Sequence, residues 1–249
     1  MLLSYILEGY TMKFSIDYTT RWHDTDAQRN VRPSAMLVYM QETSNRHVAH
    51  SGMSLDDLRD EKGLAFILSK IRIAYRRPLK AFEDITVETF TCPSRGYSSI
   101  RGFRILSGDE IVAEADTTWA LVDINDKRLC RMEESGYIFD DEPAPSIDIP
   151  SRTRAASDIQ MSEIGKRAIV YSDLDYNMHM NNTRYPDMLC DFLPIEKVQR
   201  IKGMTLSYLH EAAYGDTLTV LRGEKDGTYY FRTVSTDGTI CLEAIVVTE

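Results

Sequence analysis

The sequence lacks a surplus of positive charge, any long apolar run and any signal for export. Its 29 Lys and Arg against 38 Asp and Glu leave a formal net charge of −9, which disfavours generic binding to nucleic acid or to an anionic membrane. No stretch approaches the roughly 18 consecutive apolar residues of a transmembrane helix. The first ten residues have neither the basic segment nor the apolar length of a signal peptide. A cytoplasmic location is therefore expected, without nucleic-acid or membrane partners.

Clustered cysteines and a serine-nucleophile motif are also missing. The four cysteines are spread along the chain without a CxxC pair or neighbouring histidines, so neither a zinc site nor a disulfide framework is indicated, and no cofactor or metal ion is expected. There is no GxSxG segment. The chain has 249 residues, of which 43% are hydrophobic and 27% are charged. This length and composition allow one large or two ordinary globular domains.

A polar segment stands out against this background. Asp175, Asn177 and His179 occupy alternate positions, and Glu211 follows in a separate segment. If the first segment is extended, alternate side chains share one face. Imidazole and carboxylate can exchange protons near neutral pH, and an amide N–H can hold a carbonyl oxygen that becomes anionic. The pattern predicts an acid–base site; the alternative is a polar loop whose side chains only satisfy a turn.

The chain repeats itself. Residues 23–31 match residues 172–180 at an offset of 149, including both aspartates of each segment. Further on, residues 73–75 match 206–208 at an offset of 133, and residues 84–87 match 216–219 at an offset of 132. A period this long predicts a duplicated domain rather than a solenoid, whose units run to tens of residues.

Each repeat carries a helix signal followed by strand signals. In the first, apolar and small residues step by three and four from Pro33 to Val48, and Gly52 ends the run. Strands are expected at 71–75, 85–88, 111–113 and 119–121. The second repeat predicts a shorter helix at 183–192 and strands at 204–208, 218–221, 229–233 and 240–247, with Asp-Gly hairpin turns at 226–227 and 237–238. Each repeat thus predicts one helix followed by an antiparallel sheet. This is an α+β pattern in which each sheet wraps around its helix.

The repeats set the expected domain boundaries. Residues 133–166 contain three of the chain's eight prolines with acidic and serine-rich flanks, which is typical of a linker. The expected organisation is an N-terminal domain at 1–132, a linker at 133–166 and a C-terminal domain at 167–249.

The two repeats differ where the chemistry is expected. The first repeat has Asp26, Gln28, Asn30 and Pro78 where the second has Asp175, Asn177, His179 and Glu211. Both proton-handling groups are therefore absent from the first repeat. This predicts a catalytic second domain and a degenerate first domain that serves as scaffold or lid; the alternative is neutral drift of two loops.

These segments resemble a known family. SDLDYNMHMNNTRY around Asp175, LSYLHEA around Glu211 and KIRIAYRRPL in the first repeat are similar to the acyl-acyl-carrier-protein thioesterases, which are built from two hot-dog domains in tandem. The similarity extends from about Phe14 to the end of the chain. It implies hydrolysis of the thioester between a fatty acyl chain and acyl carrier protein, which releases free fatty acid. The absence of a plastid transit peptide indicates a bacterial member.

The resemblance implies that Asp175, Asn177, His179 and Glu211 form the catalytic set. Plant relatives have a cysteine after the glutamate, whereas this chain has Ala212, so water is the expected nucleophile. We expect Glu211 to deprotonate the water, Asn177 and His179 to hold the thioester carbonyl, and Asp175 to orient the loop or His179. An exchange of roles between Asp175 and His179 stays open.

The expected partner is acyl carrier protein bearing a fatty acyl chain. Because that partner is acidic, docking needs a local positive surface. Two groups of cationic residues are candidates: Arg72, Arg76, Arg77 and Lys80, or Arg152, Arg154, Lys166 and Arg167. Two other functions compete, an acyl-CoA thioesterase using the same four groups and a non-catalytic acyl-binding module. The sequence leaves the acyl chain length open, and both monomer and homodimer stay possible.

Overall fold

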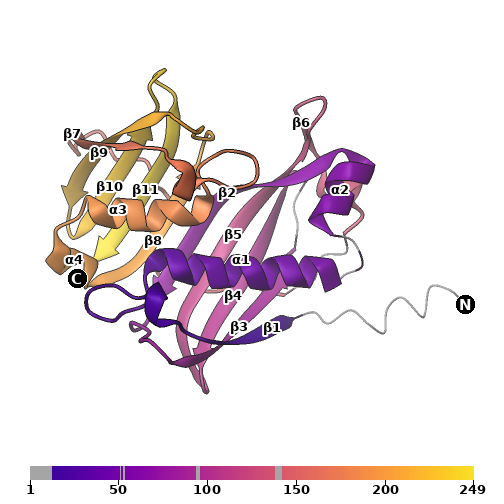
Figure 1. The fold of residues 1–249 in the computed structure, drawn as a ribbon, viewed down its shortest axis with the longest axis horizontal. Helices are drawn as coiled ribbons and strands as arrows, with labels where there is room; N and C mark the ends of the chain where they lie inside the picture. Colours follow the sequence, from indigo (N-terminus) through magenta and orange to yellow (C-terminus); the bar gives the residue numbers. More distant parts are fainter. Residues whose placement is uncertain (1–12, 51, 53, 94–95, 138–141) are drawn as a thin grey trace, which may run out of the picture.

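The chain folds around one continuous antiparallel sheet. The computed structural model describes residues 13–50, 52, 54–93, 96–137 and 142–249; the signal-peptide expectation and part of the expected linker therefore rest on residues outside this set. Eleven strands are ordered β1-β3-β4-β5-β2-β8-β11-β10-β9-β7, with β6 paired to β5. Figure 1 shows helices α1 (Pro33–His50) and α3 (Tyr185–Asp191) in front of this sheet and helix α2 (Leu55–Lys62) apart from them, near β6.

The element bounds are as follows. The strands are β1 (Phe14–Thr19), β2 (Leu64–Tyr75), β3 (Asp84–Thr91), β4 (Ser98–Ser107), β5 (Glu110–Asp123), β6 (Arg128–Cys130), β7 (Ser162–Ala168), β8 (Ile201–Tyr208), β9 (Thr217–Lys225), β10 (Thr228–Val234) and β11 (Ile240–Thr248). The α-helices are α1 (Pro33–His50), α2 (Leu55–Lys62), α3 (Tyr185–Asp191) and α4 (Ile195–Val198). Short 3-10 turns occur at Trp22–Asp24, Met132–Ser135, Tyr171–Asp173 and Asn182–Arg184.

The duplication is visible in the strand order. Read outward from the middle of the sheet, the first half runs β2, β5, β4, β3, β1 and the second runs β8, β11, β10, β9, β7. The halves join where β2 pairs with β8, and Arg72 faces Thr205 at the centre of this pairing, between Lys70↔Ser207 and Ala74↔Gly203. Arg72 and Thr205 differ by the repeat offset of 133, so the junction is a pseudo-twofold centre. This is the α+β, tandem hot-dog architecture that the sequence predicted.

The outer strands correct one predicted register. The sequence placed Asp84 over Asp216 at an offset of 132. In the structure, the first two buried residues are Ile85 and Val87 in β3 and Leu218 and Val220 in β9. Matching these pairs requires an offset of 133. A slip of one residue exchanges the two faces of a strand. The match of Asp84 with Asp216 therefore gave the wrong alignment of these two strands.

Helix α1 forms as its spacing predicts. Pro33 is its first residue, and Leu37, Met40, Ser44 and Val48 are all buried. Its counterpart α3 is shorter, and the two helices meet where the backbone N–H and hydroxyl of Ser34 donate to the carboxylate of Asp187, at 3.0 and 2.5 Å. One hydrophobic core contains residues from both helices and from β2 and β8, so the halves share a core as well as a sheet.

The segment between the halves lies against the sheet. Gly203 alternates with the core residue Met204 and so faces away from the helices. A Cβ on Gly203 would lie 2.6 Å from the side chain of Ile149, and the hydroxyl of Thr205 donates to the carbonyl of Pro150 at 2.7 Å. Residues 149–150 therefore cover the junction of β2 and β8, and β7 begins at Ser162, within the stretch expected as linker.

Several elements have no counterpart among the sequence predictions. These are the edge strands β1 and β7, the strands β4 and β6, and the helices α2 and α4. Helix α2 matters most for the site described below. Its N-terminus is closed by a reciprocal capping box between Ser54 and Asp57, and Gly63 ends it with a φ of 65°. Both signals are present in the sequence.

Candidate active site

The segment around Asp175 is a closed turn rather than an extended strand. One carboxylate oxygen of Asp175 accepts hydrogen bonds from the backbone N–H groups of Asn177 at 2.8 Å and His179 at 3.3 Å. The backbone N–H of Asp175 donates to the carbonyl of His179 at 2.9 Å, and Met178 has a φ of 65°. Because the segment is a turn, the single shared face that an extended segment would give does not form. Asp175 points into the turn, and the turn presents the following side chains.

A second loop brings Glu211 to this turn. The backbone N–H of Met180 donates to the carbonyl of Ala212 at 2.8 Å, and that of Tyr214 donates to the carbonyl of Met178 at 3.1 Å. Glu211 is held just before these contacts, and its Oε2 lies 3.2 Å from Nδ1 of His179. The side chains of His179 and Glu211 are 30% and 66% exposed. The predicted pair is thus assembled, and a substrate can reach it.

Asn177 points to a different partner. Its Oδ1 accepts a hydrogen bond of 3.1 Å from Nη1 of Arg59 in helix α2, so the contact joins the C-terminal turn to the N-terminal half. Among the described residues, the Asn177 side chain forms no hydrogen bond with His179 or Glu211. Sequence reasoning missed Arg59, although the capping box and the glycine that end α2 could have located its helix.

The first repeat builds the same turn without the reactive groups. One carboxylate oxygen of Asp26 accepts from the backbone N–H groups of Gln28 at 2.8 Å and Asn30 at 2.9 Å. Arg29 has a φ of 63°, as Met178 has in the second repeat. The backbone N–H of Val31 donates to the carbonyl of Leu79 at 2.8 Å, which repeats the Met180–Ala212 contact. The alignment of the repeats, with Pro78 at the position of Glu211, is confirmed.

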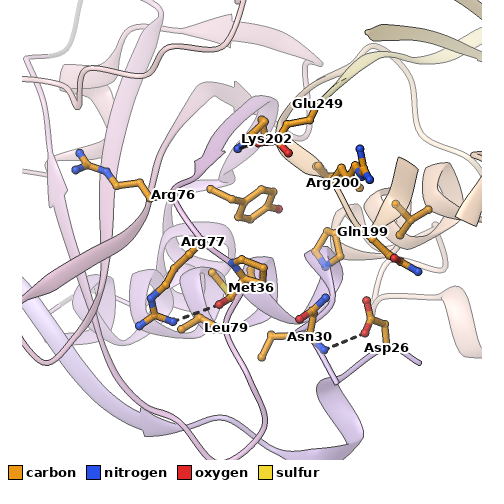
Figure 2. Close-up of a pocket in the computed structure, with 16 residues that line it drawn as sticks. Asp26, Asn30, Met36, Arg76, Arg77, Leu79, Gln199, Arg200, Lys202 and Glu249 are labelled. Carbon is orange, nitrogen blue, oxygen red and sulfur yellow. Dashed lines mark hydrogen bonds and ion pairs between the residues drawn. The ribbon is translucent and has the colours of Figure 1, made fainter. Parts of the chain in front are cut away.

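A cavity of about 280 Å³ lies beside this vacated turn. Figure 2 shows Asp26 and Asn30 on one side of it and Arg200, Lys202 and Glu249 on the opposite side. The Asn30 oxygen accepts from the ammonium group of Lys80, and Lys202 is paired with Glu249. These polar groups bind one another, and the positions equivalent to His179 and Glu211 hold Asn30 and Pro78 instead.

The cysteines are unsuited to act as nucleophiles here. Burial raises the pKa of the Cys241 thiol, which lies 3.9 Å from the backbone carbonyl of Glu211. Burial also raises the pKa of Cys190, and that of Cys92 to about 11. Because the thiolate is the nucleophilic form, these groups stay protonated and unreactive near neutral pH. Cys130 is fully buried.

The described residues contain no group of three or more His, Cys, Asp or Glu side chains arranged to hold a metal ion. Within the same residues, no helix has both the length and the apolar character needed to cross a bilayer.

Comparison with known proteins gives concordant matches. The family model for the acyl-ACP thioesterase N-terminal domain matches residues 11–137, and that for the C-terminal domain matches residues 156–246. A chloroplastic palmitoyl-acyl carrier protein thioesterase of Arabidopsis thaliana is 22% identical over 84% of this chain and 54% of its own length. A chloroplastic oleoyl-acyl carrier protein thioesterase of the same plant is 25% identical over 86% of this chain and 63% of its own length. The chain thus spans little more than half of the curated relatives it matches.

Solved structures share the fold over nearly the whole chain. An acyl-ACP thioesterase from Bacteroides thetaiotaomicron has a TM-score of 0.86 at 22% identity, covering 96% of this chain and 98% of its own. A 12:0-ACP thioesterase from Umbellularia californica has a TM-score of 0.83 at 19% identity over the same shares. At these identities the likeness establishes the tandem hot-dog fold and leaves the chemistry to the residues of the site.

Proposed function

Since the chain belongs to the acyl-acyl-carrier-protein (acyl-ACP) thioesterase family, we propose that it hydrolyses the thioester of fatty acyl-ACP and releases free fatty acid. The observation that carries this proposal is the contact of 3.2 Å between His179 Nδ1 and Glu211 Oε2. It occurs beside a turn that the fold builds twice, and only in the repeat that has both groups. A pair of proton-handling side chains open to solvent can activate water for acyl transfer.

Glu211 is the base in this proposal. Its carboxylate takes a proton from a water molecule while the water oxygen bonds to the thioester carbonyl carbon. The carbon–sulfur bond then breaks, and the leaving thiolate takes the proton back from the Glu211 carboxyl group. The sum is thioester plus water giving carboxylic acid plus thiol. Ala212 and the buried, protonated cysteines offer no competing nucleophile.

His179 and Asn177 stabilise the carbonyl oxygen as it becomes anionic. When the imidazole is protonated, Nδ1–H donates to Glu211 and Nε2–H is left to donate to the substrate. The side-chain amide of Asn177 adds a donor that does not titrate.

Asp175 acts by shaping the turn. The oxygen that accepts from the backbone of Asn177 and His179 fixes both residues without touching the substrate. Of the two roles expected for Asp175, its contacts support orientation of the loop rather than of the imidazole. The same contacts count against an exchange of roles between Asp175 and His179.

The partner in this proposal is an acidic carrier protein. The ion pairs within the chain help to choose between the two cationic groups that are candidates for docking it. In the first cationic group, Arg72 pairs with Asp116, Arg76 with Glu114, and Arg77 with Glu83 and Glu110. These charges are neutralised within the fold. In the second group, Arg167 is likewise paired, with Asp173. We therefore propose docking at the remaining members of that group, Arg152, Arg154 and Lys166, and expect charge reversal there to raise KM for the carrier-linked substrate.

The test is release of free thiol from acyl-ACP thioesters of several chain lengths, measured beside acyl-CoA thioesters with the same chains. Faster turnover of the carrier-linked substrates supports the proposal and gives the chain-length preference. Preference for acyl-CoA would instead assign an acyl-CoA thioesterase. A bound acyl chain without hydrolysis of either series would assign a binding module.

Location and assembly are part of the proposal as well. We propose a cytoplasmic protein on the strength of the sequence expectation alone; the curated plant relatives are named chloroplastic. The pairing of β2 with β8 supplies within one chain the contact that separate hot-dog domains make between chains. This favours a monomer over a homodimer, and the mass in solution measured by light scattering distinguishes the two.

A further inference from the structure

Helix α2 is fixed firmly for a helix of eight residues. The Ser54–Asp57 capping box closes its N-terminus, and Gly63 closes its C-terminus by donating from its backbone N–H to the carbonyl of Arg59 at 3.0 Å. Leu58 is 1% exposed and packs in a small core with residues of β2, β5 and β6. The ammonium group of Lys62 donates to the carbonyl of Ser135 at 2.7 Å. The backbone that carries Arg59 is therefore held at both ends.

Arg59 makes two contacts with consecutive residues of the C-terminal turn. Nη1 donates to Oδ1 of Asn177 at 3.1 Å, and the guanidinium lies over the ring of Tyr176, 5.5 Å from its centroid. Stacking on an aromatic ring and donation to an oxygen use different parts of a planar guanidinium. Together they restrict the Asn177 amide, which is otherwise exposed on a turn.

The hydrogen bond determines which way the amide faces. An amide has its oxygen on one side and its NH2 group on the other, so an oxygen bound to Arg59 leaves the NH2 group to donate elsewhere. Donation toward the substrate carbonyl is the role proposed for Asn177 above. The guanidinium also keeps the amide oxygen, a second acceptor, away from the developing negative charge.

The first repeat supplies the contrast. Gln28, at the position of Asn177, has a buried Oε1 without a hydrogen-bond partner among the described residues. The guanidinium of Arg29 lies over Trp22, which belongs to the same half. The nearby Asn30 oxygen accepts from Lys80, also of the same half. In these two repeats, only the turn with the acid–base pair has its amide held by an arginine from the opposite half.

We propose that Arg59 is a positioning residue for Asn177, through which the N-terminal half sets the geometry of the C-terminal active site. This inference rests on the proposed function for its catalytic consequence, and on the contacts alone for its structural part. It assigns the degenerate half a direct contribution to the site, beyond that of a scaffold.

Kinetics of Arg59→Met and Arg59→Lys test the catalytic part. Because misplacing a catalytic group by about 1 Å can cost up to about 100-fold, we expect Arg59→Met to lower kcat about tenfold with little change in KM, and Arg59→Lys to lose less. In an Asn177→Ala background, Arg59→Met should change kcat less than twofold, since the group it positions is gone. An equal loss in both backgrounds, or a rise in KM alone, would overturn the proposal.

Arg46→Met is the matched control for charge. Arg46 is an exposed arginine of the same half, paired with Glu42 in α1, and its removal changes the net charge equally. We expect it to leave kcat unchanged. If it lowers kcat as much as Arg59→Met does, the effect is a general loss of positive charge near an acidic carrier, and the positioning role is wrong.

A readout independent of turnover separates this inference from the proposed function. The side-chain NH2 resonance of Asn177 can be assigned by its loss in Asn177→Ala, and we expect Arg59→Met to shift it and speed its hydrogen exchange. An unchanged resonance would overturn the inference even if the enzyme is active. A wild type that hydrolyses no thioester would overturn the proposed function, while the resonance would still decide whether Arg59 orients the amide.

Discussion

The two halves share a loop and differ in what the loop carries. Asp26 and Asp175 each use one carboxylate oxygen to bind two backbone N–H groups of their turn. The residues that follow differ, and so does the residue that faces them, Pro78 or Glu211. A side chain kept in both repeats therefore forms the structure common to both, whereas side chains confined to one repeat are the candidates for chemistry. Within one chain, this comparison separates Asp175 from the rest of the predicted catalytic set.

The halves also differ in how they neutralise charge at this position. In the first, cations occupy the site: Lys80 binds the Asn30 oxygen, and arginines line the cavity beside it. In the second, an imidazole faces a carboxylate at 3.2 Å, and the pair is open to solvent. The first arrangement consumes its polar groups in contacts with one another. The second leaves them able to act on another molecule.

The sharpest test of the comparison exchanges the residue that faces the turn. Removing a general base typically costs about 10²- to 10⁴-fold in rate, so we expect Glu211→Ala to abolish most turnover of acyl-ACP. Pro78→Ala, at the matching position of the first half, should change kcat less than twofold. Free-thiol release measures both, with circular dichroism to confirm that each variant is folded.

A folded Glu211→Ala protein that retains more than a tenth of wild-type turnover would remove Glu211 from the role of base. The acid–base function would then pass to His179 alone. A large loss in Pro78→Ala would break the comparison itself, because it would give the first half a part in the chemistry that its residues do not suggest.

Sequence patterns predicted the elements whose side chains repeat at a fixed period. Helix α1 was predicted because Leu37, Met40, Ser44 and Val48 follow a helical spacing and all face the core. The repeat itself was detectable because both turns need the same aspartates. The edge strand β7 was missed because its side chains are exposed or half-buried on both faces and no apolar alternation marks it. The edge strand β1 was missed although its apolar residues alternate with polar ones along residues 14–19, a signal that the sequence does contain.

The structure brings His179 and Glu211 together, as the sequence predicted, and the contacts of Asp175 agree with its expected role in orienting the loop. The shared face that alternate spacing would give in an extended segment does not form, because Met178 at a φ of 65° turns the chain and points Asp175 inward. Arg59 could not be predicted, because its contact with Asn177 joins residues 118 positions apart and depends on how the two halves are docked. No local pattern contains that information.

A smaller effect is expected from the aspartate that both turns share. Asp175→Ala leaves two backbone N–H groups without their acceptor, so we expect a loss of about 2 kcal/mol in the free energy of unfolding and, through displaced side chains, of about 100-fold in kcat. Asp26→Ala should lose about the same stability with less than a threefold change in kcat. Urea denaturation and thiol release measure the two effects separately. Equal losses of activity in both variants would mean that the first turn supports the active site directly.

The smallest effect concerns the side chains of Glu83 and Asp216, which occupy matching positions behind the two turns. The backbone carbonyl of Glu83 accepts from the backbone N–H of Thr20, and that of Asp216 accepts from the backbone N–H of Ile169. Partial burial alone would raise the pKa of Glu83, but hydrogen bonds from Arg77, the Lys80 backbone and Ser107 outweigh it and lower that pKa to about 2. The pKa of Asp216 is lowered mainly by the hydroxyl of Thr236. One carboxylate is held by a cation, and the other by neutral donors.

Both pKa values are lower in the folded protein than in the unfolded chain, so both carboxylates stabilise the fold above the unfolded pKa and lose this effect as pH falls through the folded one. We expect Glu83→Gln to cost about 1 kcal/mol at pH 7 and the difference from wild type to vanish between about pH 4.5 and pH 2. Because Glu83 faces Arg77, added salt should shrink its contribution, whereas that of Asp216, measured with Asp216→Asn, should change little. Urea titrations at two salt concentrations measure this difference. If the stability of both variants depended equally on salt, the two halves would stabilise the residues behind their turns in the same way. The halves would then differ only in their reactive side chains.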